Sequence, residues 1–250
     1  MRLVRVIGAA ALAALVVGGC GSSSPSSSGP SSNGVANESA GQILSSTLSA
    51  LSSATSVTIS GTETKSGKTL QISGVFFSNG DANATLTFSA EPVQLVKIGS
   101  TDYLKASSAF WASNGIPTTD LSKLANVWVS ISDSLAHVGS ALSLQGIASS
   151  LTKDVGTLTK GSTSTIDGQA VIAINSSTQG TLYVATTGPA YPVEAVGKSG
   201  SSGIGSLKFT MWNQGTTPTP PAGSKTLAQL GLAGSGGGAS GASGSTGAPS

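Results

Sequence analysis

Short segments in which apolar and polar residues alternate, separated by turn-forming residues, fill most of this 250-residue chain. In residues 83–88, with the sequence Asn-Ala-Thr-Leu-Thr-Phe, every second side chain is apolar. A period of two puts successive side chains on opposite faces of an extended strand. The pattern therefore predicts a large antiparallel sheet built from short strands.

The predicted strands form two groups that follow an N-terminal helix. The helix is predicted over Glu38–Ala54, because Leu44, Leu48 and Leu51 recur at helical spacing. The first group of strands is a meander, and the second group begins about fifty residues later. We place the strands at 57–61, 69–77, 83–88, 93–98 and 101–105, and then at 156–160, 164–166, 170–175, 181–186, 193–196 and 206–212.

The section between the two groups has a different pattern. It contains an irregular stretch at Phe110 and Trp111, a short helix over 119–124, a short strand over 127–131 and a helix over Ser134–Lys153. The fold class is therefore α+β. An open sheet of about ten strands exposes an apolar face, which must close into a barrel, split into a sandwich or be covered by helices. Two amphipathic helices favour the third solution, and the scarcity of aromatic residues leaves room for a pocket.

The first twenty residues have the layout of an exported bacterial lipoprotein. Arg2 and Arg5 precede an apolar run over 6–17 that is too short to cross a bilayer. Val17-Gly18-Gly19-Cys20 resembles a lipobox, in which the cysteine receives a diacylglyceryl group and the preceding peptide is removed. Two or more acyl chains hold a protein stably on a membrane. The alternative is an ordinary cleaved signal peptide with an incidental cysteine.

These features divide the chain into four parts. We assign 1–19 to a lipoprotein signal peptide, 20–37 to a flexible Ser/Gly/Pro-rich tether, 38–221 to one folded domain, and 222–250 to a disordered Gly/Ser-rich tail. Segments of this composition cannot bury enough apolar surface to offset the entropy of ordering them.

Charge and metal-ligating residues exclude several classes of function. Apart from Arg2 and Arg5, the 12 basic residues are 10 lysines, which balance 10 acidic residues. A neutral domain without a basic cluster has no surface for nucleic acid. One histidine and one cysteine cannot build a usual zinc site, so we predict neither a metal nor a cofactor.

Three short patterns suggest enzymes but lack the residues that each enzyme class needs. Gly67-Lys68-Thr69 has no correctly spaced upstream glycine for a phosphate-binding loop. Ser150 and Lys153 have the spacing of an acylating pair without its companion motifs, and His137 has no nucleophile elbow as partner. We predict a non-enzymatic protein with no catalytic residues. A secreted hydrolase that uses His137 or an acidic residue remains the enzymatic alternative.

Several blocks along the predicted sheet resemble the actinobacterial LppX/LprG-type lipoproteins (LppX_LprAFG), which share a fold with the LolA/LolB carriers. These blocks are Asp102–Lys105, Phe110-Trp111, Val127–Val129, Thr165–Gln169, Thr181–Val184, Tyr191–Val193 and Phe209–Asn213. The resemblance spans about Glu38 to Thr219. It implies a LolA-like incomplete antiparallel β-barrel wrapped around helices, with an apolar cavity for acyl chains. Members of this family are associated with carrying lipids or lipoglycans across the cell envelope.

The resemblance also implies which side chains would contact a ligand. We predict the cavity lining at Leu44, Leu48, Ile59, Leu70, Ile72, Phe76, Leu86, Phe88, Ile172, Ile174, Leu182, Val184, Leu207, Phe209 and Met211. Ordinary packing in the core is the alternative role for each of these residues.

Two hypotheses of different classes follow. The first is a carrier that binds lipid or lipoglycan acyl chains, is held on the outer face of the cytoplasmic membrane by lipidated Cys20, and serves an envelope transporter. The second is a structural or accessory envelope lipoprotein that engages a protein partner and holds no lipid.

Overall fold

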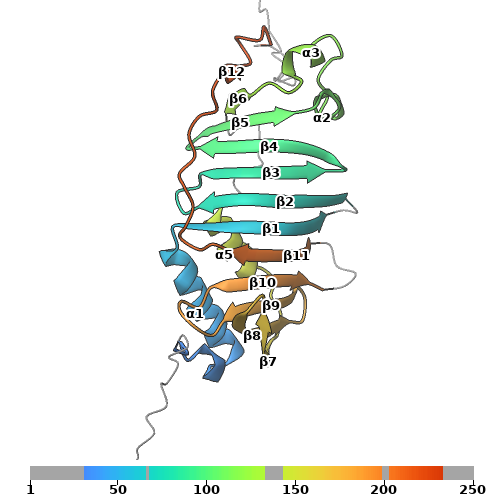
Figure 1. The fold of residues 1–250 in the computed structure, drawn as a ribbon. Helices are drawn as coiled ribbons and strands as arrows, with labels where there is room; N and C mark the ends of the chain where they lie inside the picture. Colours follow the sequence, from blue (N-terminus) through green and yellow to red (C-terminus); the bar gives the residue numbers. More distant parts are fainter. Residues whose placement is uncertain (1–30, 66–67, 133–142, 199–202, 233–250) are drawn as a thin grey trace, which may run out of the picture.

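The computed structural model describes residues 31–65, 68–132, 143–198 and 203–232 (Figure 1). Within these ranges, no helix combines the length and the apolar character needed to cross a membrane. The elements in chain order are η1 (Val35–Asn37), α1 (Ala40–Ser53), β1 (Ser56–Lys65), β2 (Lys68–Phe77), β3 (Ala82–Phe88), β4 (Glu91–Ile98), β5 (Thr101–Ala106), α2 (Ser108–Ser113), α3 (Leu121–Leu124), β6 (Val129–Ser132), α5 (Leu144–Thr152), β7 (Leu158–Ile166), β8 (Gln169–Ser176), β9 (Gly180–Ala185), β10 (Pro192–Gly197), β11 (Gly203–Thr210) and β12 (Lys225–Thr226).

The strands of the described residues join in one twelve-stranded sheet, with β12 at one edge and β7 at the other. Strands β1 to β6 form one meander and β7 to β11 another, and antiparallel pairing of β1 with β11 joins the two. Figure 1 shows the sheet as a tall, curved wall that does not close on itself. The predicted α+β class and incomplete antiparallel barrel are confirmed.

Most of the predicted strands are present, and two local predictions are wrong. The strands predicted at 156–160 and 164–166 are one strand, β7, because a bulge between Lys160 and Thr163 shifts the register without ending its pairing with β8. The stretch predicted to be irregular at Phe110 is helix α2. Its start is fixed by Ser107, whose hydroxyl accepts a hydrogen bond from the Phe110 amide at 3.2 Å.

The helix predicted over Ser134–Lys153 is confirmed for α5. The Ser143 hydroxyl caps its start by accepting a hydrogen bond from the Gly146 amide at 3.0 Å. Residues 134–142 of this prediction, with His137, lie outside the described residues.

Helix α1 starts at a capping box and covers part of one face of the sheet. The Ser39 hydroxyl accepts from the Gln42 amide at 3.4 Å, and the Gln42 side-chain carbonyl accepts from the Ser39 amide at 3.0 Å. Ile43 and Leu51 on α1 are buried, and the helix contacts α5, β7 and β8. We call the face that packs against α1 and α5 the inner face, and the opposite face the outer face.

The folded body extends beyond both predicted limits. Val35, in the segment assigned to the tether, is 3% exposed. Past residue 221, β12 pairs in parallel with β6, and Leu232 is buried in the core. The chain between β11 and β12 crosses the outer face near the ends of the strands (Figure 1), where the Gly215 amide donates to the Ser56 hydroxyl at 2.9 Å.

Two glycines allow neighbouring strands to approach closely in the middle of the sheet. Gly61 on β1 has a φ of 147°, and a Cβ atom there would lie 1.9 Å from the carbonyl oxygen of Ser206 on β11. A Cβ atom at Gly74 on β2 would lie 2.4 Å from the Cα of Ala84 on β3. Contacts this short are possible only without a side chain. The close pairing of β1 with β11 and of β2 with β3 therefore depends on these glycines.

The Gly74→Ala substitution tests this dependence. We expect it to lower the free energy of unfolding by about 1–3 kcal/mol, because the added methyl group overpacks against the Ala84 backbone. Gly41→Ala is the matched control: Gly41 lies on α1 with nothing within 4 Å of its Cβ position. It should stabilise the protein by up to about 1 kcal/mol through helix propensity. Denaturant unfolding followed by circular dichroism measures both, and equal stabilities would contradict the proposed constraint.

Candidate functional site

The predicted cavity-lining residues form one apolar layer between the inner face and the helices. Nine of them are buried in it: Ile59, Ile72, Phe76, Leu86, Ile172, Ile174, Leu182, Val184 and Phe209. Five others are partly buried and pack against it: Leu44, Leu48, Leu70, Phe88 and Leu207. Over most of its length this layer is a packed core.

A slot opens into the layer where α1 and α5 meet the ends of β8, β9 and β10. Its volume is about 40 Å³. Leu44, Ile174 and Leu182 line it, as predicted for a cavity, together with Leu151 of α5 and Ala195 of β10. The sequence analysis did not select the last two, although both lie on predicted elements at apolar positions. This slot, hereafter the inner slot, is a narrow depression whose apolar side chains belong to or pack against the inner layer.

Two facing glycines form part of the rim of the inner slot. Gly180 on β9 and Gly197 on β10 are direct partners in the antiparallel ladder, and both line the slot. A Cβ atom at Gly180 would lie 2.1 Å from the carbonyl oxygen of Val196, so the strands are close here too. Their role depends on a pairing register, which the sequence analysis did not assign.

Ser176 at the end of β8 and Gln179 in the β8–β9 turn hold the end of α5, and the segment that follows it, over the rim. The Gln179 side-chain amide donates to the carbonyl oxygens of Ser150, at 3.2 Å, and of Lys153. The Ser176 hydroxyl donates to the carbonyl oxygen of Val155 at 2.6 Å. This set of bonds, which we call the α5 latch, connects the helix that covers the inner slot to the strands beneath it.

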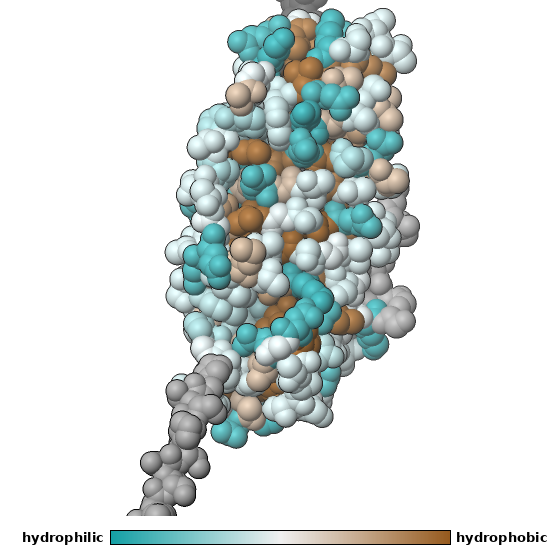
Figure 2. Space-filling model, in the orientation of Figure 1, coloured by the Kyte–Doolittle hydropathy of each residue, from teal (hydrophilic) through white to brown (hydrophobic). Residues whose placement is uncertain are grey.

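A second depression lies on the outer face, at the opposite ends of β8 and β9. This outer groove has a volume of about 340 Å³. Its lining includes Ile166, Ala185, Tyr191, Val193, Met211 and Trp212, with Asp167 and Lys208 among them. Figure 2 shows the outer face, where hydrophobic side chains reach the surface over the lower strands among polar ones.

Met211 lies in the outer groove and not in the inner layer for which it was predicted. It follows the last residue of β11 and has a φ of 49°, so the alternation of the strand ends before it. Its side chain is 57% exposed, which is unusual for a large apolar residue in the described chain.

Next to Met211, aromatic packing and one ion pair fix the shape of the outer groove. The rings of Tyr191 and Trp212 stack with centroids 4.3 Å apart and planes at 9°. The Lys208 ammonium donates to the Asp167 carboxylate at 2.7 Å. This hydrogen bond and the charge of Asp167 raise the pKa of Lys208 above its ordinary value. The groove therefore combines a rigid apolar surface with a neutralised charge pair.

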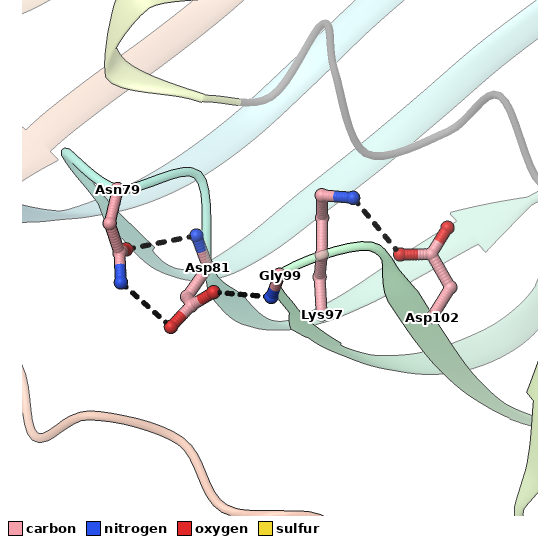
Figure 3. Close-up of polar contacts among 5 residues, drawn as sticks. All are labelled: Asn79, Asp81, Lys97, Gly99 and Asp102. Atoms are coloured by element: carbon pink, nitrogen blue, oxygen red, sulfur yellow. Dashed lines mark hydrogen bonds and ion pairs between the residues drawn. The ribbon is translucent and has the colours of Figure 1, made fainter. Parts of the chain in front are cut away.

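A buried ion pair interrupts the apolar inner face at the far end of the sheet (Figure 3). Lys97 on β4 and Asp102 on β5 are direct ladder partners, 5% and 0% exposed, with Nζ and Oδ1 3.5 Å apart. Beside them, the buried Asp81 carboxylate accepts from the Gly99 amide at 2.8 Å and from the Asn79 side chain at 2.9 Å. These contacts connect the β2–β3 turn to the β4–β5 turn.

The residues considered for catalysis or metal binding are not brought together into a site within the described part of the chain. Ser150 and Lys153 lie at the exposed end of α5, where the Ser150 hydroxyl donates to the Gly146 carbonyl of its own helix at 2.9 Å. In the parts of the chain that the structure describes, no group of three or more His, Cys, Asp or Glu residues is placed to hold a metal ion. Cys20 and His137 lie outside the described residues.

No protein-family model matches the sequence, and no curated protein matches it significantly. Among solved structures, the fold is similar to that of LprF from Mycobacterium bovis, with a TM-score of 0.50 and 15% identity over 72% of this chain and 96% of that one. Weaker likenesses are to the MucA/MucB complex of Pseudomonas aeruginosa (TM-score 0.34, 12% identity, 72% and 58% of the chains) and to a DUF1329 family protein from Desulfovibrio piger (0.24, 9%, 66% and 75%). The likeness to LprF confirms the predicted resemblance to the LppX/LprG type at the level of the fold.

A double-mutant cycle on Lys97 and Asp102 tests whether the two charges depend on each other. Either Lys97→Met or Asp102→Leu alone should destabilise the protein by about 3–5 kcal/mol, because it leaves the other charge buried without this partner. The double variant should lose much less than the sum, since two apolar residues of similar volume replace the pair. Free energies of unfolding in denaturant that add within error would show that the charges act independently.

Proposed function

We propose that this protein is a non-enzymatic lipoprotein of the bacterial cell envelope that binds an acyl chain of a lipid or lipoglycan through the inner slot. The observation that carries the proposal is the slot itself, whose apolar side chains lead from the rim into the inner layer. The fold shared with LprF supports the same proposal, because the family resemblance given above implies a lipid-binding lipoprotein.

Hydrocarbon burial supplies the binding energy in this proposal. Each methylene removed from water contributes about 0.8 kcal/mol, so a long acyl chain needs an apolar lining and no catalytic group. The same contribution holds the acyl chain in a bilayer. The free energy of moving the acyl chain between the bilayer and the protein is therefore close to zero. A slot of about 40 Å³ is far smaller than the roughly 300–1,000 Å³ of typical ligand pockets. Binding therefore requires α1 and α5 to separate from each other and from β8–β10.

The sequence of the first twenty residues supports the location. A lipidated Cys20 would hold the exported protein on the outer face of the cytoplasmic membrane, next to its source of lipid. An envelope transporter is the partner class that such a carrier would serve.

The second candidate function is an accessory lipoprotein that engages a protein partner and holds no lipid. One observation favours it: most of the predicted lining residues pack against one another. Native mass spectrometry of residues 21–250, produced in a host that contains lipids, separates the two functions. Co-purified lipid supports the carrier. A clean apo mass without uptake of labelled acyl probes supports the accessory protein and overturns the carrier.

Filling the inner slot tests its role directly. Leu44→Trp should lower affinity for a dansyl-labelled fatty acid by about tenfold, which corresponds to lost burial of roughly two methylenes. Ser49→Trp, on the exposed side of the same helix, is the matched control and should bind like the unmodified protein. Fluorescence titration measures both affinities. Equal binding by the two variants would place the ligand elsewhere.

Opening of the α5 latch should control the rate of uptake. Gln179→Ala removes the donor to the Ser150 and Lys153 carbonyls. Because one hydrogen bond contributes about 0.5–1.5 kcal/mol, probe association should accelerate by about two- to tenfold. Gln94→Ala, at an exposed position of β4, is the control. Stopped-flow fluorescence gives both rates, and unchanged association in Gln179→Ala would show that α5 does not open.

A further inference from the structure

We propose that the outer groove is the surface on which the protein rests on the bilayer, with Met211 and the partly exposed Trp212 in contact with the lipid headgroup region. The inference rests on the lipid anchor of the proposed function. It concerns a different face of the molecule from the inner slot, and it needs no ligand in that slot.

The first step is the place where the described chain begins, at the rim of the groove. The Asn33 amide donates to the Thr186 carbonyl at 2.9 Å. The Asn33 side chain donates to the carbonyls of Ala185, at 3.0 Å, and Gly188, at 2.9 Å. Ser32 forms a bridge with Thr187. Ala185 and Thr187 line the outer groove. These bonds fix residues 32 and 33 beside the groove.

The second step is the short length of chain between that rim and the anchor. Ser32 follows Cys20 by twelve residues. Even fully extended, twelve residues span at most about 40 Å. A lipidated Cys20 therefore holds the rim of the outer groove within about 40 Å of the bilayer, and the far end of the sheet near α3 has no such direct connection. The tether gives the protein a high effective concentration at the membrane surface, so even a weak contact between the groove and the bilayer is substantially populated.

The third step is the chemistry of the groove. Met211 is 57% exposed, and Tyr191 and Trp212 lie beside it in a rigid stack. Aromatic rings with one polar edge favour the boundary between water and lipid. The Trp212 indole N–H donates to the Pro192 carbonyl, and the Tyr191 hydroxyl accepts from the Asn213 side chain. Lys208 is paired with Asp167, so its charge adds little net attraction. The contact should therefore depend on apolar insertion more than on salt.

A lipid surface fits this groove better than the preceding segment of the chain does. Residues 21–31 are all Ser, Gly or Pro. Such side chains offer little apolar surface to match Met211 and Ile166. The first methylenes beneath the lipid headgroups do offer it.

Site-specific labelling of the full, lipidated protein in vesicles tests the proposal. The chain has a single cysteine, Cys20, whose thiol is consumed by the anchor, so Met211→Cys provides a single free thiol for a fluorophore. Ser73→Cys, at an exposed position of the outer face on β2, is the matched control. Flotation of phosphatidylethanolamine/phosphatidylglycerol vesicles selects anchored protein before the measurement.

Quenching by spin-labelled lipid is the readout. The label at residue 211 should be quenched at least about threefold more strongly than the label at residue 73, because docked side chains lie about 5–10 Å into the headgroup boundary. Equal quenching at the two positions would overturn the proposal, because the body would then stand away from the bilayer.

A second reporter keeps the test independent of the label at residue 211. Thr210→Cys carries the fluorophore at the neighbouring exposed position, and Met211→Asp is added to the same chain. Docking predicts that Met211→Asp removes most of the quenching at residue 210, while thermal unfolding stays unchanged. Quenching that persists would overturn the role of Met211. Acyl-probe binding in the same samples reports separately on the inner slot, so failure of one proposal does not imply failure of the other.

Discussion

Close backbone contact at Gly61 and Gly74 is the constraint on which the rest of this structure depends. A side chain at either position would meet the backbone of the neighbouring strand, at Ser206 or at Ala84. Without those side chains, β11, β1, β2 and β3 can pair in one continuous, curved sheet. The apolar inner face of this sheet gives α1 and α5 a surface to pack against. The inner slot exists where this packing ends, at the facing glycines of β9 and β10.

The sequence predicted the elements better than it predicted the openings between them. Alternation identified the strands because one face of each is buried, as in β3, where Ala82, Ala84 and Leu86 point inward. It failed at β7, where a bulge interrupts the period without ending the strand. It failed again at Met211, where a positive φ ends the alternation one residue after β11.

The same contrast holds for the candidate site. The apolar residues of the inner layer could be selected by period, because burial leaves a pattern in the sequence. Whether those residues pack together or leave space depends on the distance between elements, which is not encoded in any one segment. Leu151 and Ala195 line the inner slot but were not predicted, because no local sequence pattern describes how α5 and β10 are placed relative to each other. The outer groove was not predicted at all, since it joins residues from β7, the β9–β10 connection and the end of β11.

The pairing of β1 with β11 also has a consequence for how the chain assembles. Each meander is made of neighbours along the chain, and local pairings of this kind form early at small entropic cost. The ladder between Thr58 and Thr210 instead closes a very long loop. During synthesis from the N-terminus, β1 has a free hydrogen-bonding edge until the ribosome has produced nearly the whole domain. The protein therefore folds correctly when β11, its penultimate strand, pairs with β1 before another chain binds to that edge.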